Sequence, residues 1–210
     1  MKNNNISAAV VRRLPKYYRH LGDLERMGIE KISSQQLSEK TGFTASQIRQ
    51  DLNHFGGFGQ QGYGYKISDL KDAITEIIGL DKHYKAIIVG FGHIGQAIYN
   101  YNGFDVAKFD VVGVFDTEDK EVNGIKVRSI DSMNDFLREN KVDIAVLTVP
   151  VEVAQEVCDM FEEGMVGAIW NFAPTDLKVK YRIPVESVHL SESLYSLIFY
   201  LWNIDDYKQK

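Results

Sequence analysis

An apolar run leads directly into a glycine motif at Ala86-Ile87-Ile88-Val89-Gly90-Phe91-Gly92-His93-Ile94-Gly95. The run is typical of a buried strand, and residues 94–101 have a helical pattern. Each glycine then has a physical task. Gly90 permits a tight turn, Gly92 lets backbone N–H groups approach a pyrophosphate, and Gly95 lets the helix pack close to the strand. The helix N-terminus supplies partial positive charge for phosphates. Strand, motif and helix in this order predict a dinucleotide-binding Rossmann unit.

A second strand is expected at 109–115, and Asp116 stands at its end, 21 residues past Gly95. An acidic residue at this strand end bonds the adenosine ribose hydroxyls of a dinucleotide. Thr117-Glu118-Asp119 follow, with no arginine at hand for a 2′-phosphate. The sequence therefore favours NAD and NADH over NADP(H) as cofactors. A Rossmann-like domain that holds no nucleotide is the alternative.

The Rossmann unit continues with alternating helices and strands. Helices are expected at 131–140 and 152–163, and strands at 142–150, 166–171 and 183–190. This alternation predicts an α/β fold with a doubly wound parallel sheet. Ligands of such sheets bind outside the carboxyl ends of the strands. The candidate cofactor-binding residues are therefore the glycine motif, Gly90, Phe91, Gly92, His93, Ile94 and Gly95, together with Asp116, Thr148, Val149, Pro150, Asn171 and Phe172.

The chain before this unit carries several helix signals. One or two helical turns are expected at 6–13, and a new helix is expected to begin near Pro15, which a first helical turn tolerates, and to end at Gly28. A linker helix at 69–80, capped by Ser68, is expected to lead into the Rossmann unit. The predicted domains are thus an N-terminal domain with its linker helix at 1–80, a Rossmann domain at 81–190 and a C-terminal helix at 191–210.

Two capping-box patterns stand between these helices. Ser33 with Gln36 begins a short helix that ends at Gly42, and Thr44 with Gln47 begins the next one. Two short helices joined in this way predict a helix-turn-helix whose later helix reads DNA. The candidate DNA-binding residues on its outward face are Ser46, Gln47, Arg49, Gln50 and Asn53, to which we add Arg12, Arg13 and Lys16. A plain helical hairpin with a solvated polar face is the alternative.

A second glycine motif, Gly57-Phe58-Gly59-Gln60-Gln61-Gly62, fails as a nucleotide signature because a helix precedes it and a strand follows it. Its glycines and aromatic residues instead favour a β-hairpin, the wing of a winged helix. Such a wing could lie against the minor groove, with Gln60, Gln61 and Lys66 near the DNA backbone. The alternative is a flexible loop.

The distribution of charge is consistent with a DNA-binding N-terminal domain and a separate nucleotide-binding domain. The net charge of −5 alone argues against nucleic acid, but residues 1–66 hold 10 Lys and Arg against 5 Asp and Glu, and the remainder 14 against 24. Cys158 is the single cysteine, so neither a disulfide framework nor a thiolate zinc site is expected. The sequence contains neither a membrane-helix pattern nor a signal-peptide pattern, so a cytoplasmic location is expected.

The last helix is expected at 192–202, capped by Ser191, and it is apolar almost all round. One face of a small Rossmann domain offers too little surface to bury it. We expect a homodimer in which this helix packs on, or swaps into, the partner subunit. Coverage of the sheet edge within one chain is the alternative.

These residues resemble the Rex family of redox-sensing bacterial repressors over essentially the whole chain. The most specific segments are Ser46–Leu52 and Phe55–Gly59 with Gly62–Tyr65. The resemblance implies a homodimer with a swapped C-terminal helix, binding to A·T-rich palindromes in double-stranded DNA, and release when NADH replaces NAD⁺. It also implies a switch network that includes Tyr101. Many members have a basic residue or Asn at the position of His93 and Asp at that of His189, so this chain departs from an Arg–Asp pair.

The expected function is therefore a redox-sensing transcriptional repressor without catalytic residues. An NAD-dependent dehydrogenase is the main alternative, but it leaves the N-terminal module unexplained, and His189 is the only histidine after Asp116. A DNA-binding protein that senses another nucleotide or a coenzyme A ligand is a third option, which Asp116 disfavours.

Overall fold

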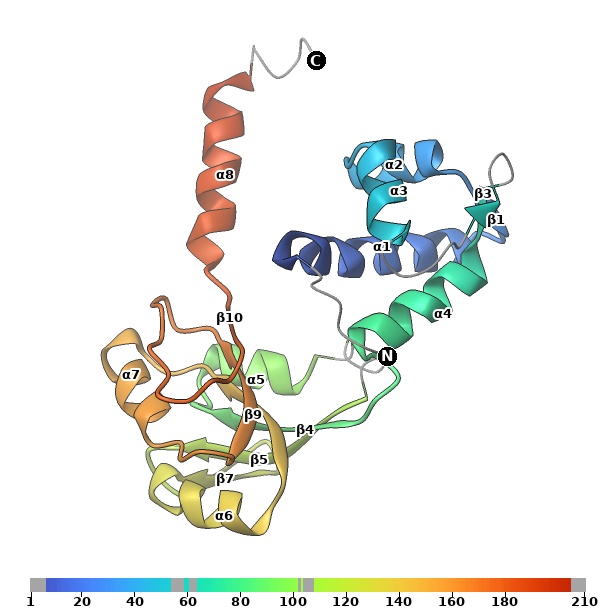
Figure 1. Ribbon diagram of the computed structural model, residues 1–210. Helices are drawn as coiled ribbons and strands as arrows, with labels where there is room; N and C mark the ends of the chain where they lie inside the picture. Colours follow the sequence, from blue (N-terminus) through green and yellow to red (C-terminus); the bar gives the residue numbers. More distant parts are fainter. Residues whose placement is uncertain (1–6, 54–58, 61–63, 102, 104–107, 205–210) are drawn as a thin grey trace. The chain divides into compact units, whose positions relative to one another are not determined.

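The computed structural model describes residues 7–53, 59–60, 64–101, 103 and 108–204, and the chain divides into two compact units, Met1–Lys82 and His83–Lys210 (Figure 1). Each unit has its own hydrophobic core, as domains do. The first core consists mainly of helical side chains, and its largest members are Leu14, Tyr17, Leu21, Leu37, Ile48, Leu52, Ile67, Leu70 and Ile74.

The first helix, α1, runs without interruption over Ala8–Arg26. The prediction of two separate segments was wrong, because Pro15 lies inside this helix. Proline removes one helical hydrogen bond. The helix continues nevertheless, since burial of each large apolar side chain contributes about 1.5–3 kcal/mol and one stripe on both sides of Pro15 is buried: Val10, Leu14, Tyr17, Leu21 and Leu24.

The second helix, α2 at Ser34–Thr41, begins with the predicted capping box. Ser33 Oγ accepts a hydrogen bond from Gln36 N at 3.1 Å, and Gln36 Oε1 accepts one from Ser33 N at 2.8 Å. Gly42 ends the helix with a φ of 76°, the left-handed conformation that glycine adopts without strain.

The third helix, α3 at Ala45–Asn53, follows after the short turn and completes the helix-turn-helix. Gln47 N donates to Thr44 Oγ1 at 3.2 Å, and Thr44 N donates to Gln47 Oε1 at 3.0 Å, so the second predicted capping box is also confirmed. The inward face of α3 carries Ile48 and Leu52, which are buried in the core of the first unit.

A small antiparallel sheet joins the helix-turn-helix. Its strands are β1 at Lys31–Ile32, β2 at Gly59–Gln60 and β3 at Gly64–Lys66, in the order β1-β3-β2. The β2–β3 pair is the hairpin that the sequence predicted as a wing; residues 54–58 and 61–63, including Gln61, lie outside the described part of the chain. β1 was not predicted, because two residues give no periodicity signal.

The linker helix, α4 at Ile67–Ile78, starts earlier than expected and ends at Gly79. The expected cap by Ser68 was wrong, since β3 runs directly into the helix and Lys66 holds the N-cap position without a side-chain hydrogen bond. Ile67 N donates to Glu30 O at 2.9 Å, and the Ile67 side chain is buried, which fixes the helix start directly beside the small sheet.

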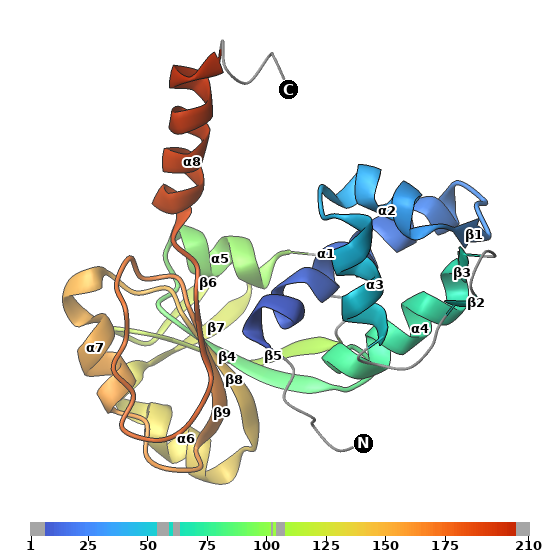
Figure 2. The ribbon, with the colours of Figure 1, turned by 45° about the horizontal axis from the view of Figure 1, so that its top comes forward.

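A sheet forms the centre of the second unit (Figure 2). It has seven strands in the order β10-β9-β8-β4-β5-β7-β6. Among the strands that the structure describes, every neighbouring pair is parallel except β6 with β7. The predicted parallel, doubly wound sheet is confirmed, and the antiparallel edge strand is an addition. The strands are β4 at Tyr84–Val89, β5 at Phe109–Asp116, β6 at Lys120–Val122, β7 at Ile125–Ser129, β8 at Val142–Leu147, β9 at Val166–Asn171 and β10 at Val185–Ser187.

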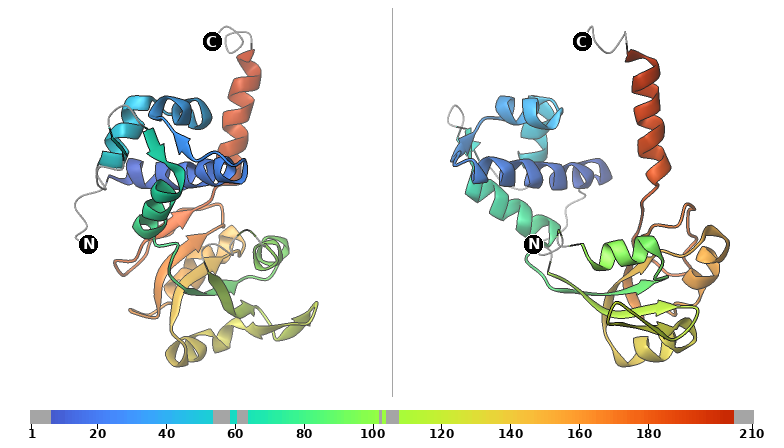
Figure 3. Two further views of the ribbon diagram at one scale, coloured as in Figure 1. Left: turned by 90° about the vertical axis from the view of Figure 1, so that its right-hand side faces the viewer. Right: turned by 180° about the vertical axis from the view of Figure 1, so that it is seen from behind.

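Helices lie on both faces of this sheet (Figure 3). One face packs against α6 at Met133–Glu139, which follows the 3₁₀ turn η2 at Ile130–Ser132, and against α7 at Val151–Asp159. On the other face, α5 at His93–Tyr99 is the one described helix that joins the apolar cluster, where Phe109 and Trp170 stay half-buried.

The last described helix is α8 at Leu190–Trp202, and none of its residues is buried. It begins at an N-cap formed by His189, earlier than the expected cap at Ser191. No helix within the described residues is long and apolar enough to cross a membrane. The exposed apolar side chains of α8 are Leu190, Leu194, Tyr195, Leu197, Ile198, Phe199, Tyr200, Leu201 and Trp202.

Candidate dinucleotide site and nucleic-acid interface

The glycine motif forms the turn between β4 and α5, and its three glycines meet different surroundings. Gly90 has a φ of 90°, and a Cβ there would lie 2.8 Å from the Thr148 carbonyl oxygen. A Cβ on Gly95 would lie 2.2 Å from the Gly90 carbonyl oxygen, so only glycine permits this helix packing. Gly92 is different, since no atom lies within 4 Å of a Cβ built on it. The backbone at Gly92 is therefore open to a ligand.

Asp116 ends β5 beside this turn. Its Oδ2 accepts hydrogen bonds from Lys120 Nζ at 2.7 Å and from Phe91 N at 3.4 Å, while its Oδ1 accepts one from Thr117 N at 2.9 Å. Partial burial alone would raise the pKa of Asp116, but the hydrogen bonds from Lys120 and Thr117 hold it below the ordinary value. The carboxylate is charged and keeps acceptor capacity for hydroxyl groups.

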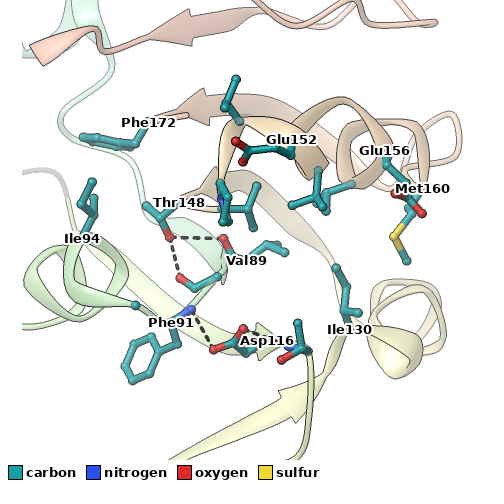
Figure 4. A pocket seen from close by; sticks show the side chains of 18 of the residues that line it. Val89, Phe91, Ile94, Asp116, Ile130, Thr148, Glu152, Glu156, Met160 and Phe172 are labelled. Atoms are coloured by element: carbon teal, nitrogen blue, oxygen red, sulfur yellow. Dashed lines mark hydrogen bonds between the residues drawn. The ribbon is translucent and has the colours of Figure 1, made fainter. Parts of the chain in front are cut away.

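A cavity of about 860 Å³ lies outside the carboxyl ends of β4, β5 and β8 (Figure 4). This volume falls within the usual range for small-molecule sites, and the open backbone at Gly92 and the acceptor at Asp116 suit a dinucleotide. Ten of the sequence-predicted cofactor residues line it: Gly90, Phe91, Gly92, His93, Ile94, Asp116, Thr148, Val149, Pro150 and Phe172.

The other three predicted residues are not in the described cavity wall. Gly95 packs inside α5 against the turn. Asn171 is fully buried, and its amide group donates to the carbonyl of Thr175 at 2.7 Å and to Ser187 Oγ at 3.2 Å. Tyr101 is 60% exposed. Asn171 thus braces the chain beyond β9, a structural task that the sequence pattern does not distinguish from ligand contact.

Thr148 has a similar bracing task at the cavity wall. Its hydroxyl donates to the carbonyl oxygen of Gly90 at 2.6 Å and lies 3.2 Å from that of Val89 (Figure 4). The end of β8 therefore holds the glycine turn in place. This contact requires the hydroxyl, which explains why a threonine stands in an otherwise apolar strand end.

Sequence reasoning missed a second group of wall residues. Most of them directly follow a strand end, so extending the strand-end rule by one helical turn would have found them. Glu156 and Met160 lie further along the chain after β8, and only tertiary packing brings them to the cavity. The missed residues are Val89, Thr117, Ile130, Asp131, Val151, Glu152, Val153, Glu156, Val157, Met160 and Pro174.

The outward face of α3 presents polar side chains together. Ser46, Arg49, Gln50 and Asn53 line one shallow hollow on the surface, and all four are exposed. Arg49 Nη1 donates to Ser34 Oγ at 2.9 Å. Side chains of these types bond base edges and phosphates in a major groove. The Gln47 amide oxygen is engaged in the capping box, so this residue has a structural contact besides its predicted DNA contact.

Three further predicted DNA-binding residues belong to α1 and β3. Arg12 and Lys16 are exposed, and the Lys16 ammonium group lies 5.3 Å from the centre of the Phe43 ring. Lys66 Nζ donates to Asp69 Oδ1 at 2.8 Å. The backbone of Gln60 belongs to β2.

Arg13 has a different environment. Its Nε and Nη2 donate to the two oxygens of Asp51 at 2.6 and 2.7 Å, and Tyr17 Oη donates to the same carboxylate at 2.8 Å. Asp51 is only 2% exposed. The hydrogen bond to Asp51 raises the pKa of Arg13, and burial, with the same carboxylate, raises that of Tyr17. The guanidinium group thus joins α1 to α3.

A helix-turn-helix with a wing and a Rossmann unit with an open glycine turn together define a transcriptional regulator built on a nucleotide-binding fold. Two family models agree with this division: "Putative DNA-binding protein N-terminus" matches residues 5–53, and "CoA binding domain" matches residues 81–175. The chain belongs to the Rex family of redox-sensing transcriptional repressors.

Curated relatives carry that name over nearly the full chain. The redox-sensing transcriptional repressor Rex of Clostridium acetobutylicum is 52% identical over 200 residues, which cover 93% of this chain and 94% of the relative. The repressor of the same name from Clostridium perfringens is 49% identical over 211 residues, covering 99% of each chain.

Solved structures of RSP, a Rex-family repressor, share the fold. The complex of RSP with β-NAD⁺ and operator DNA has a TM-score of 0.87 and 44% identity, and covers 99% of this chain and 97% of RSP. The complex with β-NADH has a TM-score of 0.88 and 42% identity, with 99% of each chain covered.

Proposed function

We propose that this chain represses transcription by binding palindromic operator DNA as a homodimer, and that it releases the DNA when NADH replaces NAD⁺ in the Rossmann cavity. The observation that carries the proposal is the combination within one chain of an open glycine turn beside Asp116 and a polar recognition face on α3. RSP, a structural neighbour at over 40% identity, binds β-NAD⁺, β-NADH and operator DNA.

NAD(H) fits the cavity better than coenzyme A, although the family model that matches residues 81–175 is named after coenzyme A. Asp116 offers a charged acceptor where an adenosine ribose lies in Rossmann domains. Coenzyme A carries a phosphate on this ribose, and a carboxylate beside it would repel that phosphate. The nicotinamide half of the nucleotide would lie toward Thr148, Pro150 and Phe172.

The exposed apolar helix α8 supports the homodimer. Nine large apolar side chains on α8 are exposed, and burial of each would contribute about 1.5–3 kcal/mol. The α5 face of the sheet leaves Phe109 and Trp170 half-buried. A second copy of this chain would supply an apolar surface for α8. We include exchange of this helix between subunits in the proposal.

A dimer of this kind suits a palindromic site. Two recognition helices related by a two-fold axis read two half-sites whose major grooves lie about 34–36 Å apart. We expect Ser46, Gln50 and Asn53 to contact base edges, with Arg12, Lys16 and Arg49 on phosphates. A wing beside the minor groove favours A·T-rich operators, where that groove is narrow and strongly negative.

Release of DNA requires two states of the dimer. NAD⁺ and NADH differ by one positive charge and by ring planarity, and a ligand shifts an equilibrium only through different affinities for the two states. The helices α4 and α8 are the proposed levers, because α4 follows the DNA-binding fold directly and α8 joins the subunits. A small change in the distance between recognition helices spoils their match to successive grooves.

The curated relatives are named as repressors, which makes this chain a regulator. We further propose that it does not turn over its nucleotide and that it works in the cytoplasm, where bacterial DNA lies. Its domains would be the winged helix with its linker at 1–80, the Rossmann domain at 81–190 and the dimerisation helix at 191–210.

The decisive experiment measures binding to a labelled palindromic A·T-rich duplex at fixed salt while the NADH:NAD⁺ ratio varies. Typical allosteric coupling predicts about 5- to 150-fold weaker DNA binding with NADH than with NAD⁺. Coenzyme A in place of NADH is the control and should leave DNA binding unchanged. Equal DNA affinity with both nicotinamide nucleotides would reject the switch, and steady consumption of NADH would favour a dehydrogenase.

A further inference from the structure

The first residue of β6, Lys120, supplies a cation that sequence spacing did not reveal. No arginine stands among the residues that directly follow Asp116, Thr117-Glu118-Asp119, but the β6–β7 hairpin turns Lys120 back toward the end of β5. Its Nζ lies 2.7 Å from Asp116 Oδ2, and the two side chains are 34% and 20% exposed. The hydrogen bond to Asp116 raises the pKa of Lys120, so the amine is charged.

The position of this ammonium group matters for the ribose end of a nucleotide. A ligand atom hydrogen-bonded to Asp116 Oδ2 lies within about 6 Å of Lys120 Nζ, because two hydrogen bonds of about 3 Å each meet at one oxygen. A phosphate ester on the ribose brings up to two negative charges to this place. Asp116 repels that charge, and Lys120 attracts it.

The other charged residues of the described cavity wall are carboxylates, so Lys120 strongly affects the net charge that a ribose phosphate would meet. The other carboxylates of the wall are Asp131, Glu152 and Glu156. Among the wall residues that the structure describes there is no lysine or arginine. A single cation on Asp116 therefore changes the local balance of charge strongly, since the site is partly shielded from water.

We propose that Lys120 is a specificity-determining residue: paired with Asp116 it limits how strongly the site rejects a phosphorylated ribose, and freed from Asp116 it binds the 2′-phosphate of NADP(H). The inference rests on the proposed NAD(H) function of the same cavity. Lys120 moderates the repulsion that Asp116 exerts on a 2′-phosphate. Discrimination against NADPH is thus a property of the pair, and its strength depends on both residues.

Calorimetric titration with NADH and with NADPH tests this proposal on the full-length chain and three variants: Lys120→Gln, Asp116→Asn and the double variant. The measured quantity is the ratio of the dissociation constant of NADPH to that of NADH. Lys126→Gln is the matched control, because it removes an exposed lysine from the same hairpin with the same change in net charge. Thermal melts verify that each variant is folded.

We expect Lys120→Gln to raise the ratio about tenfold and Asp116→Asn to lower it about tenfold, with tighter NADPH binding. In the double variant the gain in NADPH affinity should disappear, because the cation that produced it is gone. The gain in Asp116→Asn should also shrink as salt increases. Lys126→Gln should change the ratio less than twofold.

Two results overturn the proposal in different ways. If the chain binds NADH but the ratio stays within twofold in Lys120→Gln, and Asp116→Asn binds NADPH equally well with and without Lys120, only the role of Lys120 is rejected. If the unmodified chain binds neither nucleotide, the proposed NAD(H) function and this inference are rejected together.

Discussion

Arg13 on α1 and Asp51 on α3 form a two-pronged ion pair, with Nε–Oδ2 and Nη2–Oδ1 distances of 2.6 and 2.7 Å. The carboxylate is almost fully buried, and Tyr17 donates a third hydrogen bond to it. This pair fixes the recognition helix on the longest helix of the first unit. The inward face of α3 is therefore held by charge as well as by apolar packing.

Replacement of Asp51 by Ala should destabilise the first unit by about 3–5 kcal/mol, the usual cost of breaking a buried pair, because Arg13 and Tyr17 lose their shared acceptor. Urea unfolding followed by far-ultraviolet circular dichroism measures this loss. Asp23→Ala is the control, since it removes an exposed partner of Arg26 and should cost less than about 1 kcal/mol. Equal effects of the two substitutions would contradict a structural role for the Arg13–Asp51 pair.

Replacement of Arg49 by Ala should weaken operator binding by about 1–3 kcal/mol, roughly 5- to 150-fold, and lower the dependence of binding on salt, because one phosphate contact is lost. Fluorescence anisotropy with a labelled duplex at several salt concentrations measures both effects. Arg26→Ala removes an equal charge from an exposed position on α1 and should change affinity little. The interface on α3 is misplaced if the two variants bind alike.

Gly92→Val and Gly95→Ala should fail in different ways. A side chain on Gly92 meets no protein atom, so Gly92→Val should fold normally but lose nucleotide binding and hold its operator in the presence of NADH. A methyl group on Gly95 would lie 2.2 Å from the Gly90 carbonyl oxygen, so this variant should lower the melting temperature. Calorimetry, anisotropy and thermal melts separate the two outcomes. NADH binding by Gly92→Val with unchanged affinity would refute the pyrophosphate position.

Leu197→Glu should convert the dimer into a monomer, because a charge on the apolar surface of α8 cannot be buried without a partner. Sedimentation at micromolar concentration measures the mass, and affinity for a palindrome should fall with it. Ser193→Glu introduces the same charge at a polar position of α8 and is the control. A wild-type chain that sediments as a stable monomer would remove the basis of the dimer proposal.

The sequence predicts elements best where local chemistry decides them. The capping boxes at Ser33 and Thr44, and the order of strand, glycine motif and Asp116, follow from contacts between near neighbours in the chain. Tertiary packing decided the rest. Pro15 was expected to begin a helix, but burial on both sides keeps it inside α1. Arg13 was predicted to bind DNA, and only the fold reveals its contact with Asp51.

Tertiary structure also explains what was missed at the nucleotide site. Lys120 is only four residues from Asp116 in the chain, but its side chain meets Asp116 where the hairpin of β6 and β7 begins, and the alternating pattern did not predict that hairpin. Asn171 looks like a ligand contact in sequence, because it stands at a strand end, yet its amide faces the protein interior.

The two tryptophans of the chain occupy separate environments. The Trp170 ring centre lies 4.8 Å from that of Phe172 in the cavity wall, whereas Trp202 is 86% exposed on α8. The chain therefore has two intrinsic fluorescence probes, one beside the nucleotide cavity and one on the helix surface that we assign to the dimer interface. A Trp202→Phe chain would report occupancy alone by energy transfer to reduced nicotinamide, and a Trp170→Phe chain would report subunit exchange, so both events can be timed independently without a dye.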